Sequence, residues 1–329
     1  GANANQTITA TSSNFSTSAY GNYRIGGSVA ATAGASGDLT IGSTAYSYTA
    51  QGQVSGSAIK AGTLSINGAY GSGSVVVAAS GTAKDVAALV NAQTEKTGVS
   101  ATARTEVGLS GLVAAKSYTL KLASDNDVAQ AVTVSFTVGA GATVNADSLS
   151  DAVKAINDVS SKTGVTARLN EKSDGLILTN ASGNDIKILN DSATGSNLTV
   201  TGANGGALTG SGTLTALNGA GVIADALVIT GQLTFDSSKS FSVTDSNGGS
   251  AGGFLNTSAT AASQLQKAQH MDVSTVDAAN RTLAIVDSAI SAIASQRAAY
   301  GALQSRFETT VANLQTTSEN MAASRSRIQ

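Results

Sequence analysis

From residue 276 to its end, the chain carries one long helical pattern without proline. From Val286 on, an apolar residue recurs at every seventh position, which places these side chains in a stripe along one side of a helix. A second row, three residues earlier, is apolar only in part and contains Arg297. The stripe is too narrow for a buried helix and too long for a typical globular one, so such a helix needs other helices to pack against. We therefore expect another segment or another subunit to cover it. The members of this heptad stripe are Val286, Ile293, Tyr300, Phe307, Leu314, Met321 and Ile328.

Residues 1–255 show a different pattern, in which short apolar runs alternate with Gly, Ser and Asn turns. Such runs are typical of strands. Two stretches, at about 82–96 and 147–162, instead predict helices, and Thr82 and Ser148 each precede an Asp by three residues, as in a capping box. Together with the long terminal helix, these elements predict an α+β fold. The predicted strands cover residues 6–11, 39–41, 64–66, 74–77, 118–122 and 132–138.

The two predicted helices belong to an internal repeat. Each copy has an Asn near the end of the helix, Asn91 or Asn157, followed by Lys-Thr-Gly-Val and a return strand. The glycines of these stretches, Gly98 and Gly164, stand where a helix commonly ends in the left-handed conformation. We therefore expect two similar strand–helix–strand modules, in which the helix packs on a small sheet.

Composition narrows the function classes. The chain has 329 residues, a net charge of −2 and only 12% charged residues, so no electrostatic attraction to nucleic acid or to an anionic membrane is expected. It contains no Cys, which excludes disulfides, thiol nucleophiles and cysteine-based metal sites. No apolar run is long enough to predict a transmembrane helix.

Few side chains suggest chemistry. His270 is the only histidine, and residues 248–252 match Gly-x-Ser-x-Gly but sit in a Gly-rich turn that no helix follows at once. Asp125 and Asp127 lie in a turn-like stretch that lacks the closing Glu of a calcium loop, so weak cation binding is the minor alternative to a turn role. We expect no enzyme, no metal and no cofactor.

Tyr20 and Tyr23 are the remaining candidates for ligand binding. Their spacing would let both rings stack on a sugar. An aromatic pair within a hairpin is the favoured interpretation, and sugar binding stays open as the alternative.

Residues 296–308 read Gln-Arg-Ala-Ala-Tyr-Gly-Ala-Leu-Gln-Ser-Arg-Phe-Glu, and residues 324–328 read Ser-Arg-Ser-Arg-Ile. Preceded by Asp-Val-Ser-Thr at 272–275, this helix resembles the carboxy-terminal rod helix of bacterial flagellin. The repeats, with Val90-Asn91 and Ile156-Asn157 before Thr-Gly-Val, resemble a motif in the outer part of flagellins and hook proteins.

The resemblance implies a secreted, extracellular structural subunit of the bacterial flagellar filament, which self-assembles through rod helices and serves motility. Its partners would be other flagellin subunits, forming a homopolymer, and hook-associated proteins. The heptad stripe would form the subunit interface, with Arg297 in a salt bridge and Gly301 at a close helix approach. The alternatives are a hook-associated junction or cap protein, and a flagellin-like surface carbohydrate-binding protein or adhesin.

The family's amino-terminal rod helices and final coiled segment have no counterpart in this sequence. We therefore expect the isolated chain to stay monomeric. In the family, much of the surface that the innate immune receptor for flagellin recognises belongs to the amino-terminal helices, so binding of this receptor is expected to depend on them.

The sequence thus predicts five segments. They are a β-rich segment leading out of the rod (1–60), a first repeat module (61–130), a second repeat module (131–195), a β-rich segment returning to the rod (196–256) and a helical rod segment (257–329).

Overall fold

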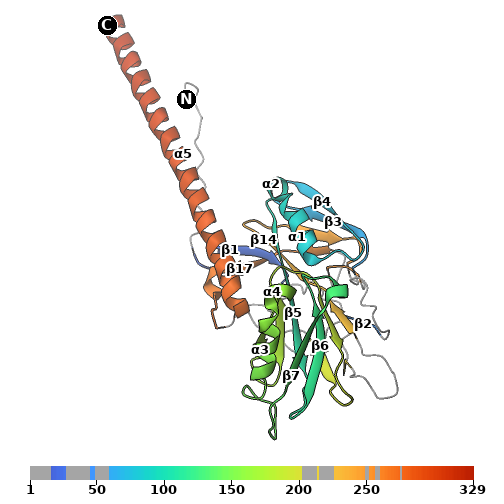
Figure 1. Cartoon of the computed structure of the whole chain (residues 1–329). Coiled ribbons are helices and arrows are strands. Elements are labelled where there is room, and N and C mark those ends of the chain that lie inside the picture. The colour runs from blue at the N-terminus through green and yellow to red at the C-terminus, as the bar shows by residue number, and fades with distance from the viewer. Residues whose placement is uncertain are drawn as a thin grey trace. The chain divides into compact units, whose positions relative to one another are not determined.

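The computed structural model describes two compact units (Figure 1). We call the unit within residues 23–265 the central unit, and the one formed by residues up to 22 and from 266 on the terminal unit. Strands and helices are mixed, and one long helix ends the chain, so the α+β prediction is confirmed. The described residues are 16–26, 45–48, 59–201, 213–214, 226–248, 252–255, 260–274 and 276–329.

The central unit is built on three sheets within its described residues. The largest follows the order β12-β11-β5-β14-β1, with β9 pairing β5 and β8 pairing β9; its strands are β12 (Thr213–Leu214), β11 (Leu198–Thr201), β5 (Ser100–Ser110), β14 (Gln232–Ser237), β1 (Gly21–Ile25), β9 (Leu176–Asn180) and β8 (Val165–Leu169). The second follows β2 (Ala45–Tyr48), β13 (Ala226–Ile229), β10 (Ile186–Asn190), β6 (Ser117–Ala123) and β7 (Val132–Thr137). The third follows β16 (Thr260–Ala262), β15 (Ser242–Asp245), β3 (Gly62–Asn67) and β4 (Ser72–Val77).

Four predicted strands are confirmed, because residues 64–66, 74–77, 118–122 and 132–138 coincide with β3, β4, β6 and β7 to within a residue or two. Their burial alternates along the chain, as in β4, where every second residue is buried. One face of each hairpin therefore packs on a helix or sheet while the other meets solvent. The strands expected at 6–11 and 39–41 lie outside the described residues.

Both repeats have the same order of elements. In the first, the hairpin β3–β4 leads to α1 (Ala83–Asn91), α2 (Thr94–Thr97) and the return strand β5. In the second, the hairpin β6–β7 leads to α3 (Ser150–Asp158), α4 (Ser160–Thr163) and β8. α3 packs on β7 and β8, and β7 forms a hairpin with β6. The second repeat therefore begins at β6, ahead of the boundary at 131 that the sequence suggested.

An Asn side chain fastens helix to return strand in each repeat. The amide of Asn91 donates to Ala101 O over 2.8 Å, and Ala101 N donates to Asn91 Oδ1 over 2.7 Å. Asn157 makes the same pair of bonds with Ala167, at 3.0 and 2.8 Å. One side chain thus satisfies both backbone groups of a strand residue that would otherwise lack partners. This explains why the sequence repeats an Asn at this position.

The repeated glycines end their helices as predicted. Gly98 has φ +73° and Gly164 has φ +70°, both in the left-handed region. A Cβ on Gly98 would lie 2.8 Å from the ring of Tyr70, and one on Gly164 would lie 2.2 Å from a carboxylate oxygen of Asp125. Both backbone angle and available space therefore favour glycine.

The helix boundaries partly correct the sequence interpretation. Each predicted helix is broken into a longer and a shorter piece. Thr82 does cap α1, since its hydroxyl oxygen accepts from Asp85 N at 3.2 Å. The prediction for Ser148 was wrong: Leu149 precedes α3 without a side-chain cap, and Ser148 instead exchanges hydrogen bonds with Asn145. This local turn competes with the helical cap for the same polar groups.

The two repeats build two apolar cores, and the later strands complete both. Val90 in α1 is fully buried in one core, which also contains Phe235 of β14 and Val243 of β15. Ile156 in α3 is fully buried in the other, together with Ile229 of β13. Within the segment expected to be a separate β-rich return, residues 226–245 therefore finish the cores of the repeats.

The segment from 257 is not helical throughout. Residues 260–267 form strands β16 and β17 (Gln264–Lys267), followed by the short helix η2 (Ala268–His270). β16 pairs with β15, and the hydroxyl oxygens of Thr244 and Thr260 lie 3.0 Å apart. The helical rod segment predicted from 257 is therefore wrong for residues 260–267, because pairing with the free edge of β15 decides the local structure of β16. The long helix α5 then runs from Val276 to Ile328, over 53 residues.

Candidate subunit interface

The turn at residues 272–274 anchors the start of α5. Thr282 donates its hydroxyl to Asp272 O at 2.7 Å and accepts from Asp272 N at 3.2 Å. The Asp272 carboxylate accepts from the backbone and the hydroxyl of Ser274, and these hydrogen bonds lower its pKa. The chain is thereby turned into the helix at a defined point.

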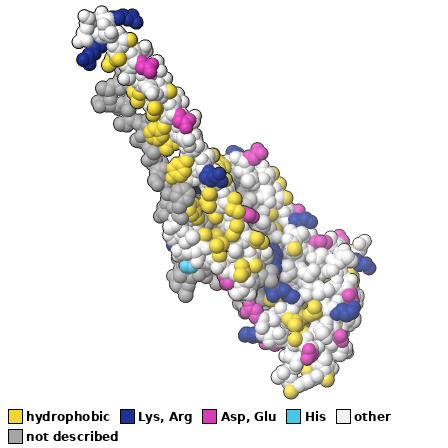
Figure 2. Space-filling model, turned by 90° about the vertical axis from the view of Figure 1, so that its left-hand side faces the viewer, with side chains coloured by type: hydrophobic (Ala, Val, Ile, Leu, Met, Phe, Trp, Pro, Cys, Tyr) yellow, Lys and Arg dark blue, Asp and Glu magenta, His cyan; other side chains and the backbone are white. Residues whose placement is uncertain are grey.

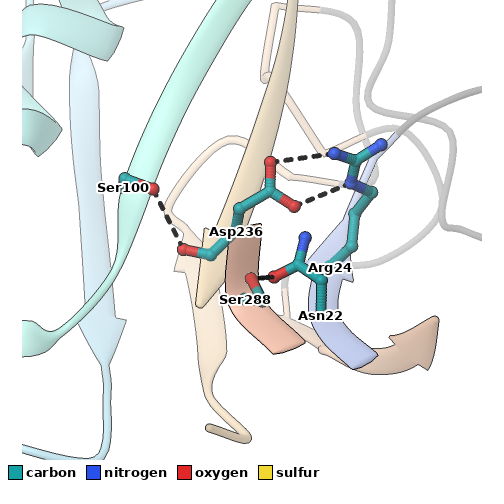
Figure 3. Close-up of polar contacts among 5 residues, drawn as sticks. All are labelled: Asn22, Arg24, Ser100, Asp236 and Ser288. Carbon is teal, nitrogen blue, oxygen red and sulfur yellow. Dashed lines mark hydrogen bonds and ion pairs between the residues drawn. The ribbon is translucent and has the colours of Figure 1, made fainter. Parts of the chain in front are cut away.

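One side of α5 is covered near its beginning. Ala278 and Ile285 are buried, and Ala292, one heptad further on, is half-buried. On the same side, the Ser288 hydroxyl donates to Asn22 Oδ1 at 3.2 Å (Figure 3), and Asn22 itself is buried. The packed side of the helix is therefore the row that starts at Ala278.

The heptad stripe lies next to this covered side and is exposed. Exposure rises along the helix, from 37% at Val286 to 87% at Ile328, and only Tyr300 is half-buried among the seven. Leu283, Ile290 and Val311 of the second row are exposed as well. Figure 2 shows hydrophobic side chains gathered along the long helix. This helix thus presents a row of mostly exposed apolar side chains, and patches of this kind are typical of interaction surfaces.

Among the described residues, no contact explains the two non-apolar residues assigned to this surface. Arg297 is exposed, and no ion pair to it occurs within the described part of the chain. A Cβ on Gly301 would meet nothing within 4 Å. The interface salt bridge and the close helix approach therefore stay predictions for an assembled state.

The two tyrosines considered for sugar stacking have separate roles. Tyr20 is half-buried, and its pKa is raised by loss of hydration and by the nearby phenol of Tyr300 on α5. Tyr23, in β1, packs against the core around Val90. The hairpin expected here is not formed, because β1 pairs with β14, which is far away in sequence; the packing of each ring favours a structural role over sugar binding.

Asp125 is held in the central unit by neutral donors. Its Oδ1 accepts from Asn180 at 2.8 Å, Asn184 at 2.7 Å and Ser182 at 3.4 Å. Burial alone would raise its pKa, but these hydrogen bonds and the charge of Lys84 lower it overall. Because Asp125 N also donates to Thr163 O, the residue ties the end of β6 to the turn at the second repeat.

The remaining described candidates, Asp127 and His270, contact residues close to them in sequence. Asp127 caps the short helix η1 (Val128–Gln130), and His270 Nε2 lies 2.9 Å from Gln269 Nε2. Across the described residues, no three His, Cys, Asp or Glu side chains come together to hold a metal. Residues 249–251 of the Gly-x-Ser-x-Gly stretch lie outside them. Among the described helices, none has the length and apolar character to cross a membrane.

Sequence reasoning missed two charged contacts of the central unit. Arg104 and Arg168, on the return strands of the two repeats, both contact the carboxylate of the mostly buried Glu106. The repeat alignment does not pair these two arginines, because Arg168 aligns with Thr102, so no repeated position signalled their convergence. Arg24 forms a two-point ion pair with Asp236, with Nε–Oδ1 at 2.7 Å and Nη2–Oδ2 at 3.1 Å (Figure 3). These two residues are far apart in sequence and carry no shared pattern.

Known protein families match both parts of this arrangement. The bacterial flagellin C-terminal helical region matches residues 283–329, which comprise α5 from Leu283 to its end and the residue that follows it. The flagellin hook IN motif matches residues 63–126 and 119–182, one match for each repeat.

Curated relatives agree with these matches. B-type flagellin of Pseudomonas aeruginosa is 34% identical over 186 residues, which cover 55% of this chain and 37% of the relative. Flagellin B of Vibrio cholerae is 46% identical over 59 residues, covering 18% of this chain and 16% of the relative. Flagellin D of Vibrio anguillarum is 39% identical over 79 residues, covering 24% and 21%.

The chain therefore spans less than two fifths of the length of these relatives. Its matched parts are nevertheless the ones that the geometry singles out, namely the long helix and the two repeats. On both parts, the chain belongs to the bacterial flagellin family.

Proposed function

We propose that this chain is part of a structural subunit of the bacterial flagellar filament and serves motility. The observation that carries the proposal is the exposed heptad stripe of α5, which coincides with the flagellin C-terminal helical region. Burying one large apolar side chain is worth about 1.5–3 kcal/mol, so a row of seven favours association strongly. The stripe is proposed as the surface that packs against other rod helices.

The proposed mechanism is repeated packing of one surface against a different surface of the next subunit. Such a head-to-tail contact generates an open helical polymer when its rotation does not close. Arg297 and Gly301 are proposed to lie in this interface, as a salt-bridge partner and as a point of close helix approach. The repeat modules, whose cores are complete, need no contribution from the polymer and are proposed to face outward.

Several finer statements follow from the same proposal. The subunit acts outside the cell, in the flagellum, and has no catalytic role. Its partners are other flagellin subunits and hook-associated proteins. The innate immune receptor for flagellin is a further proposed partner, and its binding depends on the family's amino-terminal helices.

Electron microscopy of the gene product that carries this sequence tests the proposal. Long filaments are expected; short structures restricted to the hook would favour a hook-associated junction or cap protein. Binding to a glycan array without any polymer would favour the surface adhesin.

The assembly surface itself is tested by Phe307→Asp in the same gene product. A charge within the stripe should abolish filament formation, because it would be buried without a partner. Ser305→Asp is the matched control, since it adds the same charge at an exposed position off the stripe. Normal filaments from Phe307→Asp would remove the stripe as the assembly surface.

A further inference from the structure

The chain has an unusual sulfur chemistry. It contains two Met, no Cys and no Trp. Thiols are normally the first protein groups to react with peroxides, and the methionine thioether also oxidises readily. In this chain the thioethers of Met271 and Met321 are therefore the main targets for a mild two-electron oxidant.

Both methionines are accessible, but they lie in different places. Met321 belongs to the heptad stripe of α5 and is 70% exposed. Met271 follows η2, is 48% exposed and lies outside the stripe. The structure thus places one oxidisable side chain on the proposed assembly surface and provides a second one as an internal reference.

We propose that Met321 is a site of oxidation that controls assembly, with a peroxide or a hypohalous acid as the oxidant. This inference rests on the proposed function of the stripe. With hydrogen peroxide, the thioether sulfur attacks one peroxide oxygen and the O–O bond breaks. An S=O bond forms and one water molecule leaves, so the thioether is oxidised and the peroxide is reduced.

The product changes the character of the stripe at one position. Methionine sulfoxide is polar and carries a strong hydrogen-bond acceptor, whereas the neighbouring heptad positions, Leu314 and Ile328, are apolar. Burying that oxygen against apolar side chains without a donor disfavours the assembled state. The free subunit has no such conflict, because Met321 meets solvent there.

The same geometry predicts protection by assembly. Once the stripe is covered by another helix, the oxidant no longer reaches Met321. The sensitive form is therefore the free subunit, and a filament that has already formed keeps Met321 reduced.

The test uses the gene product that carries this sequence, treated with hydrogen peroxide as monomer and as filament. Peptide mass spectrometry measures oxygen addition at Met321 and Met271, and light scattering with electron microscopy measures assembly. In the monomer both residues should be oxidised, and the critical concentration for assembly should rise roughly tenfold or more. In the filament Met321 should be protected.

Three variants separate the site from general damage. Met321→Leu should assemble normally and stay insensitive to peroxide, whereas Met271→Leu should remain as sensitive as the wild type. Met321→Gln, which is polar without oxidation, should assemble poorly in the absence of peroxide.

The outcomes distinguish this inference from the function on which it rests. If untreated protein forms no filaments, the proposed function fails and this inference falls with it. If untreated protein forms filaments and oxidised protein does so equally well, only the role of Met321 is overturned. Equal peroxide sensitivity of Met321→Leu and wild type would overturn it too.

Discussion

The helices of the repeats and the terminal helix treat their apolar residues in opposite ways. Val90 in α1 and Ile156 in α3 are completely buried, each within a core that later strands complete. Phe307 and Leu314 in α5 belong to an equally regular pattern but remain about half exposed. Burial therefore depends on what the rest of the chain supplies to each helix.

The difference teaches how to tell a structural apolar stripe from an interaction surface. A helix of nine residues such as α1 or α3 can be covered by a hairpin and a return strand of its own repeat. A helix of 53 residues needs a partner of similar length. The repeats are therefore expected to respond to mutation through stability, and the stripe through assembly.

The largest expected effect compares Ile156→Ala with Phe307→Ala. Removing a fully buried Ile side chain leaves a cavity and should lower the free energy of unfolding of the central unit by about 2–5 kcal/mol. The Phe307 change should alter that unfolding little, because its side chain is outside both cores. Urea unfolding followed by circular dichroism measures both. Similar losses in the two variants would erase the contrast between the regions.

Next come the Asn side chains that fasten helix to strand. Asn157→Ala removes two hydrogen bonds and leaves the backbone groups of Ala167 without partners, so a loss of about 1–3 kcal/mol is expected. Asn91→Ala should give a similar loss in the first repeat. Asn320→Ala, on exposed helix, is the control and should be close to neutral. Repeats that differ strongly in this measurement would not be equivalent units.

Substitutions at two glycines should change stability in opposite directions. Gly164→Val should destabilise its repeat by about 1 kcal/mol or more, because the position has φ +70° and lacks space for a Cβ. Gly301→Ala should instead favour the helical state by up to about 1 kcal/mol, since nothing lies within 4 Å. Thermal melting measures both. If Gly301→Ala stabilises the chain but impairs filament formation, the close helix approach gains direct support.

The smallest effect concerns pH and the central unit. The pKa of Asp125 is lowered in the folded state, so its contribution is present above the unfolded pKa, about 3.9, and is lost as pH falls through the folded pKa. After solvent screening the contribution should stay below about 1 kcal/mol. Asp125→Asn should flatten the fall of the melting temperature in this acidic range. An unchanged acid profile in that variant would assign the fall to other carboxylates.

Local rules determined much of this protein from sequence alone. Alternation predicted β3, β4, β6 and β7, the repeated Thr-Gly-Val predicted the left-handed turns at Gly98 and Gly164, and seven-residue spacing predicted α5. Each of these signals depends on residues close together in the chain. The stripe was identified for the same reason, since its members repeat along one helix.

Only the tertiary structure decided what lies far apart in sequence. It assigned the strands around Phe235 and Ile229 to the cores of the two repeats, and it paired Arg24 with Asp236. It also formed strands within residues 260–267, where a helix was expected, and it decided that the side of α5 that carries Ile285 is the buried one. These outcomes depend on which sheet edges and helix faces become available once the chain has collapsed, and no local pattern encodes that availability.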